Sequence, residues 1–323
     1  MKYLVTGVAG FIGMHVAKSL LNQNKVVIGI DNLNNYYDVR LKNERLNILK
    51  KYKKFKFIKQ DTKNFKSLSL IFKKKIDYVI HLAAQAGVRY SIKKPMNYIK
   101  NNVIGFQNIL DCSFKYKVKH LLYASSSSVY GSSITYPFTE NQKIDEPLSM
   151  YAATKKTNEL MAHTYSYLHK LPTTGLRFFT VYGPWGRPDM ALFIFTKAIL
   201  NNKILKVFNH GNMIRDFTYV DDIVKAIIKL IVKIPNVSTK QTPYKIFNIG
   251  LGRPIKIIKF IKIIEKILGK KSKIKFSDMQ KGDVRKTYSD VRALKKWIEY
   301  SPKIKPEIGI KYFINWYKQF YKK

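Results

Sequence analysis

Apolar residues recur along this chain in two alternating patterns. Short apolar runs of strand length cover residues 2–6 and 26–31. Between them, residues 11–21 space their apolar side chains three and four apart, as an amphipathic helix does. Strand, helix and strand in this order predict a βαβ unit with two parallel strands.

The alternation continues beyond residue 31 and predicts an α/β fold. Further apolar runs bounded by turn residues predict strands over residues 55–58, 76–84, 121–124, 175–179 and 247–250. Helical periodicity predicts helices over 39–51, which we expect to be exposed, and over 95–116. Strands that alternate with helices favour a Rossmann-like, doubly wound parallel sheet.

Three glycines stand where the first predicted strand meets the first helix. Gly7, Gly10 and Gly13 are spaced three apart, and Phe11 and Ile12 fill the last interval. Glycines at such a turn permit a tight bend, a close approach of the backbone to a pyrophosphate, and close packing of helix on strand. Because the helix N-terminus also favours anions, the pattern predicts a dinucleotide-binding loop.

A carboxylate ends the second predicted strand. Asp31 lies eighteen residues after Gly13, where it can hold a ribose 2′-OH and repel a 2′-phosphate. We therefore expect NAD as the cofactor in preference to NADP. Asn32 is assigned to the same cofactor, as is Thr62, and Asp61 either accepts a hydrogen bond from the adenine amino group or caps a turn.

Small residues follow the fourth predicted strand. Ala83 and Ala84 would let the backbone lie close to the dinucleotide. Asn102 interrupts an apolar helix face, and because a buried amide needs partners, we expect it to bridge to the backbone of the cofactor site. Arg89, in the following loop, either meets an anion or forms a surface salt bridge.

Length and composition exclude several classes of protein. The chain has 323 residues, of which 46% are apolar, so it can bury a large core and is not disordered. Lysines interrupt every long apolar run and no signal peptide precedes the first strand, so we expect a soluble cytoplasmic protein without a membrane partner. The single cysteine, Cys112, predicts no disulfide and no metal site.

The formal net charge of +40 raises the possibility of nucleic-acid binding. The basic residues are nearly all lysines spread along the whole length, whereas a nucleic-acid site would gather them on one face. We therefore expect no nucleic-acid partner. An anionic substrate would still be attracted to such a protein.

A serine-rich strand end and a helix carry the candidate catalytic groups. Ser126 belongs to the run of serines at 125–128, and Tyr151 precedes Lys155 by four residues, which places both side chains on one helix face. An ammonium group beside a phenol lowers the pKa of the phenol. This pattern predicts Tyr151 as a general base, with a serine hydroxyl that relays or orients the proton.

Two arginines are candidate ligands for a phosphate group. Arg187 and Arg215 each offer a planar fork of donors, although a structural salt bridge is the alternative for both. The carboxylates Asp221 and Asp222 have no further ligand nearby in sequence, so we expect no metal site.

These motifs together resemble the extended short-chain dehydrogenase/reductases that act on nucleotide sugars, among the NAD-dependent epimerases and dehydratases. The resemblance rests on the glycine spacing, on the residues at 31–32, 81–84 and 125–128, and on the Tyr-x-x-x-Lys motif. Longer runs at 31–38, 84–91 and 182–190 are similar to the branch that epimerises UDP-glucuronate at C4.

The resemblance implies NAD that stays bound and a UDP-sugar substrate, with UDP-glucuronate converted to UDP-galacturonate through a 4-keto intermediate. It places the neutral hydroxyls of Ser127, Ser128 and Thr180 around the sugar carboxylate and Asp283 in the loop that closes over the nucleotide. Related dehydratases carry an Asp-Glu pair, and decarboxylases a Glu, where this chain has serines, so both reactions are disfavoured.

Other functions stay open from the sequence. The nearest alternative is a 4-epimerase of UDP-glucose or of a UDP-N-acetylhexosamine, and next a UDP-glucuronate decarboxylase. An alternative of a different class is a non-catalytic NAD-binding protein whose basic surface holds nucleic acid.

The resemblance also implies a division of the chain. We expect an NAD-binding domain from residues 1–182 with 217–250, and a smaller, largely C-terminal nucleotide-sugar-binding domain from 183–216 with 251–323. Members of the family usually form homodimers through helices that correspond to 95–116 and 149–169, so a homodimer is expected here.

Overall fold

Seven parallel strands form one sheet, in the order β11-β6-β5-β4-β1-β2-β3. The computed structural model describes residues 1–238 and 241–322, so residues 239, 240 and 323 of the predicted domains lie outside it. The strand order reverses between β1 and β4, as in a doubly wound fold, and this confirms the predicted fold class. The strands are β1 (Lys2–Thr6), β2 (Val26–Asp31), β3 (Phe55–Lys59), β4 (Tyr78–His81), β5 (His120–Ser126), β6 (Thr173–Phe178) and β11 (Tyr244–Ile249).

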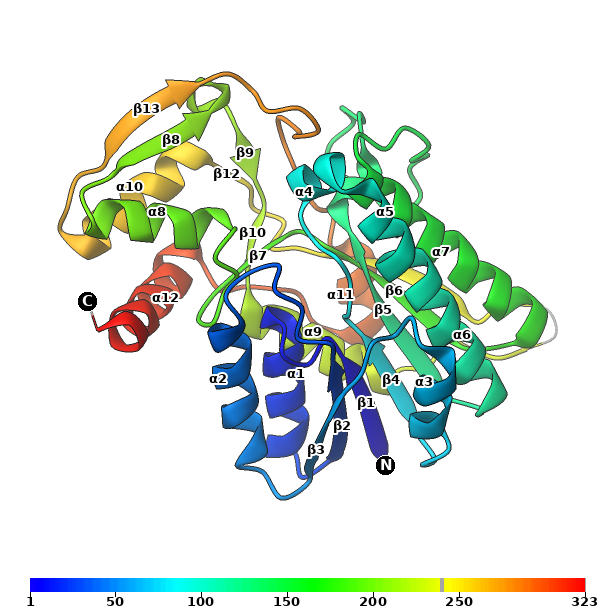
Figure 1. The fold of residues 1–323 in the computed structure, drawn as a ribbon. Coiled ribbons are helices and arrows are strands. Elements are labelled where there is room, and N and C mark those ends of the chain that lie inside the picture. Colours follow the sequence, from blue (N-terminus) through cyan, green and yellow to red (C-terminus); the bar gives the residue numbers. More distant parts are fainter. Residues whose placement is uncertain (239–240, 323) are drawn as a thin grey trace.

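Helices cover both faces of this sheet (Figure 1). Alternate residues of β1 point to opposite sides, so Tyr3 and Val5 join one core and Leu4 joins the other. The first core is shared with α1 (Phe11–Asn22), α2 (Val39–Lys50), α9 (Val220–Val232) and α11 (Arg292–Ile298). The second core is shared with α3 (Phe65–Phe72), α6 (Gly105–Lys115) and α7 (Met150–His169).

The helix predicted over 39–51 forms, but the expectation that it is exposed is wrong. Leu41, Leu46 and Leu49 are buried, and the long side chain of Arg45 is fully buried as well. The side chain of Asp38 caps the helix by accepting a hydrogen bond from the backbone N–H of Arg40. Hydrophobicity identifies the buried leucines of this helix, but it does not reveal that the polar side chain of Arg45 is buried with them.

The helix predicted over 95–116 is present as three consecutive segments. A short α5 (Pro95–Tyr98) leads into a π-helical stretch, Ile99–Ile104, which runs into α6. Asn102 lies in the π-helical stretch and is buried. Such wide turns often occur next to functional sites.

A second group of elements packs beyond the carboxyl ends of the sheet (Figure 1). The short strands β7 (Thr180–Tyr182) and β10 (Phe217–Tyr219) pair with each other in a separate two-stranded sheet. The group contains α8 (Ala191–Leu200), β8 (Ile204–Phe208), β9 (Ile214–Arg215), β12 (Ile255–Lys256), α10 (Ile257–Leu268), β13 (Lys273–Ser277) and α12 (Pro306–Tyr321). Helix α4 (Val88–Lys93) packs instead against α5 and α7. The domain boundaries at 182, 216 and 250 stay a prediction. Across residues 1–238 and 241–322, none of the helices has the length and apolar character needed to cross a bilayer.

Candidate active site

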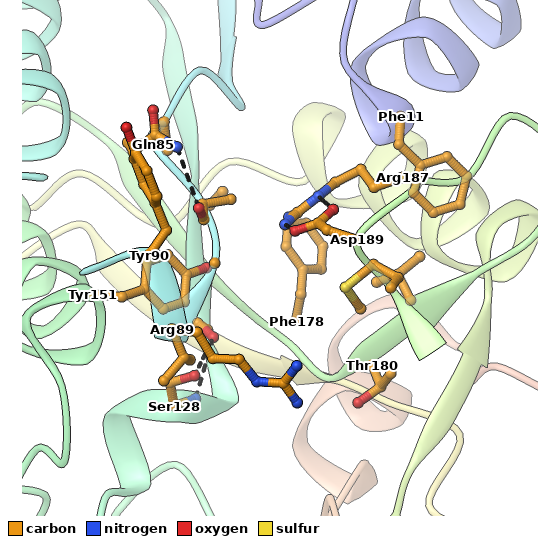
Figure 2. A pocket seen from close by; sticks show the side chains of 18 of the residues that line it. Phe11, Gln85, Arg89, Tyr90, Ser128, Tyr151, Phe178, Thr180, Arg187 and Asp189 are labelled. Carbon is orange, nitrogen blue, oxygen red and sulfur yellow. Dashed lines mark hydrogen bonds and ion pairs between the residues drawn. The ribbon is translucent and has the colours of Figure 1, made fainter. Parts of the chain in front are cut away.

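A cavity of about 810 Å³ lies at the carboxyl ends of the central strands, between the sheet and the second group of elements (Figure 2). Most of the residues predicted for the site line this cavity. They are Gly7, Gly10, Phe11, Ile12, Gly13, Asp31, Asn32, Thr62, Ala83, Ala84, Arg89, Ser126, Ser127, Ser128, Tyr151, Lys155, Thr180, Arg187, Arg215 and Asp283. Residues far apart in the sequence therefore share one concave surface.

The glycine loop at one end of the cavity has no space for side chains. A methyl group on Gly13 would lie 2.1 Å from the carbonyl oxygen of Gly7, and one on Gly10 would lie 2.8 Å from the same oxygen. Gly7 has a φ of +68°, and a methyl group on it would lie 2.8 Å from the backbone nitrogen of Ala83. The loop thus leaves backbone N–H groups at the start of α1 open to a phosphate, which fits a dinucleotide.

Asp31 closes the far side of this loop. Its carboxylate accepts hydrogen bonds from the backbone N–H groups of Ala9, at 3.1 Å, and Leu33, at 2.8 Å. Burial raises the pKa of Asp31, while Lys42 and these backbone groups oppose the rise. A carboxylate fixed in this way can still accept a hydrogen bond from a ribose hydroxyl, so this acceptor fits the adenosine ribose of NAD.

Asp61 and Asn102 are not among the residues that line the cavity. Asp61 accepts hydrogen bonds from the side chain of Asn32, at 3.1 Å, and from the backbone N–H of Lys63, at 2.9 Å. Asn102 accepts from the backbone N–H of Gln85 at 2.7 Å and donates to its carbonyl oxygen at 3.1 Å. Both side chains therefore support residues that do line the cavity, and Asn102 makes the bridge to the backbone that its burial predicted.

The candidate catalytic side chains come from α7 and from the end of β5. Ser149 caps α7 by accepting a hydrogen bond from the backbone N–H of Ala152, so Tyr151 lies in the first turn. Lys155, one turn later, is buried and donates from Nζ to the carbonyl oxygen of Ala124 at 2.7 Å. Tyr151 and Lys155 thus face the cavity from one helix face, as their spacing predicted.

The electrostatics of this pair differ from the prediction. We expected Lys155 to lower the pKa of Tyr151, but burial raises the pKa of Tyr151, and a hydrogen bond with Ser126 and the charge of Arg187 oppose the rise. Burial lowers the pKa of Lys155 to about 8, while Glu159 raises it. Removal from water is the largest effect on both groups, and the charge of Arg187 opposes the resulting rise in the pKa of Tyr151.

Arg187 is held by two residues that sequence reasoning missed. Its Nε and Nη2 donate to Asp189 at 3.0 and 2.5 Å, and the hydroxyl of Tyr36 donates to the same carboxylate at 3.1 Å. Figure 2 shows Arg187 and Asp189 across the cavity from Tyr151. The close spacing of Arg187 and Asp189 in a turn was a signal for the pair, but nothing local indicated Tyr36.

Two more arginines gather around one carboxylate elsewhere in the cavity wall. Arg215 Nη2 lies 3.1 Å from Asp283 Oδ1, and Arg89 Nη2 lies 3.8 Å from Asp283 Oδ2. The guanidinium of Arg89 also lies over the ring of Phe208, 5.1 Å from its centroid. Two cations against one anion leave a net positive charge that can attract a phosphate group.

Neutral hydroxyl groups form the part of the wall between these charges. Ser127 and Ser128 follow β5 in a short 3₁₀ turn, and Thr180 begins β7. Ser126 Oγ donates to Ser128 Oγ at 3.1 Å and accepts from its backbone N–H at 3.2 Å, which fixes the turn. Figure 2 shows Ser128 and Thr180 on opposite sides of the cavity.

Comparison with known proteins gives consistent matches over the whole chain. The description "NAD dependent epimerase/dehydratase family" applies to residues 3–250. A UDP-glucuronate 4-epimerase of Thermodesulfobacterium geofontis is 46% identical over 98% of this chain and 96% of its own, and Protein CapI of Staphylococcus aureus is 51% identical over all of both chains. The crystal structure of UDP-glucuronic acid 4-epimerase from Bacillus cereus, in complex with UDP-glucuronic acid and NAD, matches with a TM-score of 0.92 and 35% identity, over 99% of this chain and 100% of that one.

Proposed function

The chain belongs to the NAD dependent epimerase/dehydratase family, and we propose that it epimerises UDP-glucuronate at C4 to UDP-galacturonate. The observation that carries the proposal is one cavity that joins the glycine loop, Tyr151 with Lys155, and two arginines around Asp283. The relatives that act on UDP-glucuronate support this choice of sugar over neutral UDP-hexoses.

The residues that would hold NAD form a continuous part of the cavity wall. The glycine loop would take the pyrophosphate and Asp31 the adenosine ribose, with Ala83 and Ala84 against the dinucleotide. When bound, NAD supplies a hydride acceptor that takes hydrogen from the sugar C4 and later returns it. The net redox change of the reaction is therefore zero.

Tyr151 acts as the general base of the proposed reaction. Its phenolate takes the proton of the sugar 4-OH, and the phenol later returns a proton to the 4-keto oxygen. Ser126 and Arg187 stabilise the phenolate, since both lower the pKa of Tyr151. Lys155, bonded to the carbonyl oxygen of Ala124, adds a buried positive charge to the same site.

The sugar carboxylate is held by neutral groups. A 4-keto acid loses CO₂ when its carboxylate turns perpendicular to the ketone, so an epimerase must restrain it. Ser127, Ser128 and Thr180 line the cavity and offer hydroxyl groups for this task. None of these three residues is an acid, so none can serve as the acid or base that a dehydratase uses.

Arginines hold the rest of the substrate. Arg215 and Arg89 flank Asp283 and would bind the diphosphate. The negative charge of the diphosphate would balance the positive charge that the single carboxylate leaves uncompensated. Arg187 lies near Tyr151, and we therefore assign it to the sugar end of the substrate in place of the diphosphate. The diphosphate then anchors the substrate while the 4-keto sugar rotates between the two hydrogen transfers.

We also propose that two copies of the chain associate. Met96 on α5, Phe114 on α6, and Leu160 and Leu168 on α7 are each between 46% and 62% exposed. These helices lie side by side on the outside of the fold (Figure 1). An exposed apolar surface of this kind fits a second copy, and Leu160→Glu together with Leu168→Glu should give a monomer in light scattering.

One assay tests the proposed reaction. Purified protein is incubated with UDP-glucuronate, and the products are separated by chromatography, with Tyr151→Phe as the inactive control. We expect UDP-galacturonate from the parent protein and none from the variant. UDP-pentose as the main product would indicate a decarboxylase, and faster turnover of neutral UDP-hexoses than of uronates would overturn the proposed substrate.

A further inference from the structure

Helix α7 contacts the end of β5 through residues at one-turn spacing. Lys155 Nζ donates to the carbonyl oxygen of Ala124 at 2.7 Å. One turn later, Glu159 Oε1 accepts a hydrogen bond from Ser125 Oγ at 2.6 Å. One turn before Lys155, Tyr151 faces the cavity. Successive turns of the helix are therefore bonded to successive residues of the strand that delivers the active-site serines.

Glu159 is also bound to the neighbouring strand. Arg177, on β6, donates from Nε to Glu159 Oε1 and from Nη2 to Oε2, both at 2.9 Å. The side chains of both residues are 3% exposed. Arg177 Nη1 donates further to the hydroxyl of Tyr130 at 3.0 Å. The carboxylate of Glu159 therefore accepts three hydrogen bonds, one from Ser125 and two from Arg177, which fix its position.

Among the groups packed around Lys155, Glu159 is the one whose charge favours the ammonium form, although its direct ion pair is with Arg177. From α7, Tyr151 and Glu159 lie one turn to either side of it. On β4, His81 is buried, and burial together with the charge of Lys155 lowers its pKa. His81 is therefore neutral and adds no second positive charge beside Lys155. Arg177, on β6, lies beyond the carboxylate of Glu159.

We propose that Glu159 is a positioning residue of the epimerase site, which fixes α7 against β5 and keeps the ammonium group of Lys155 charged. The inference rests on the proposed function, because it assigns a purpose to the charge of Lys155. A buried ion pair is by itself weak support for added stability. Glu159 lies one helical turn after the buried Lys155, and this position gives the Arg177–Glu159 pair a role that an ion pair elsewhere in the core would not have.

The variant Glu159→Gln separates charge from shape. Glutamine keeps the size of the side chain and can accept hydrogen bonds, but it leaves Lys155 without a neighbouring anion. The pKa of Lys155, about 8 in the parent protein, should then fall further, since burial lowers it and Glu159 raises it. The alkaline limb of the kcat profile should move down by about one pH unit, so that kcat falls about tenfold at pH 9.

Ser166→Ala is the matched control on the same helix. Ser166 is fully buried and bonded to the carbonyl oxygen of Leu171 at 2.8 Å, two turns beyond Glu159 and away from the cavity. We expect Ser166→Ala to keep the alkaline limb of the parent. KM and bound NAD should be unchanged in Glu159→Gln, because neither ligand contacts that residue in the proposed site. A parent-like alkaline limb in folded Glu159→Gln would overturn the proposal.

Two further measurements cover the remaining outcomes. If Glu159→Gln does not fold, Ser125→Ala takes its place, because it removes one hydrogen bond to Glu159 but leaves the ion pair with Arg177. A kcat of Ser125→Ala equal to that of the parent would overturn the proposal that Glu159 fixes α7 against β5. If the parent protein turns over no UDP-sugar, the proposed function fails. The Lys155 pKa is then measured by ¹⁵N NMR, with the signal assigned through Lys155→Met, and an equal pKa in parent and Glu159→Gln would overturn the inference by itself.

Discussion

Arg45 donates from Nη2 to the carbonyl oxygen of Trp185 at 2.6 Å, which joins helix α2 to the turn that carries Arg187. Its Nη1 donates to the carbonyl oxygen of Ala9, in the glycine loop, at 2.9 Å. Trp185 has a φ of +62°, a left-handed conformation that costs a residue with a side chain about 1–2 kcal/mol. One buried guanidinium therefore holds the cofactor loop and the substrate turn in a fixed relation.

The first prediction concerns this link. Arg45→Met keeps much of the volume but leaves the carbonyl oxygens of Ala9 and Trp185 without their donor, at a cost of about 1–3 kcal/mol each. We expect a lower Tm and weaker retention of NAD, measured by thermal unfolding and by the NAD that stays bound through gel filtration. Arg40→Met, an exposed position on the same helix, should match the parent. A parent-like Tm and NAD content in Arg45→Met would contradict the role assigned to Arg45.

The second prediction concerns the glycine loop. Gly13→Ala would bring a methyl group to 2.1 Å from the carbonyl oxygen of Gly7, so the loop or α1 must shift. We expect loss of bound NAD and a lower Tm. Gly269→Ala is the control, because Gly269 has a φ of +66° but nothing within 4 Å of the added methyl group, and only about 1 kcal/mol of backbone strain is expected. Retention of NAD by Gly13→Ala would show that the loop can rearrange.

Most of the sheet could be predicted from the sequence because its signals are local. The run from β1 through the glycines to Asp31 contains strand, turn, helix and carboxylate in one segment, and the Tyr151–Lys155 spacing is a single helical turn. Arg45 and Tyr36 could not be assigned because their roles depend on contacts between segments far apart in the chain. The pKa of Tyr151 was predicted with the wrong sign because the extent of burial is a tertiary property.

The third prediction concerns the acidic limb of the pH profile. The charge of Arg187 lowers the pKa of Tyr151 and opposes the rise caused by burial. In Arg187→Gln the phenol needs a higher pH to ionise, and the carboxylate of Asp189 loses its cationic partner and disfavours the phenolate further. The acidic limb of kcat should move up by about one pH unit. Arg253→Gln, an exposed position, should leave the profile unchanged, and an unshifted acidic limb in Arg187→Gln would refute the assignment.

The last prediction concerns control of the sugar carboxylate. Thr180→Val keeps the shape of the side chain but removes a hydroxyl group from the cavity wall. A carboxylate with one restraint fewer turns more often to the perpendicular geometry from which the 4-keto acid loses CO₂, so the share of UDP-pentose among the products should rise several-fold. Chromatography of the products measures this share. Thr218→Val is the control, since Thr218 is fully buried in the paired strand β10 and its hydroxyl has no hydrogen-bond partner among the described residues. If Thr180→Val slows epimerisation without added UDP-pentose, the hydroxyl of Thr180 does not restrain the carboxylate.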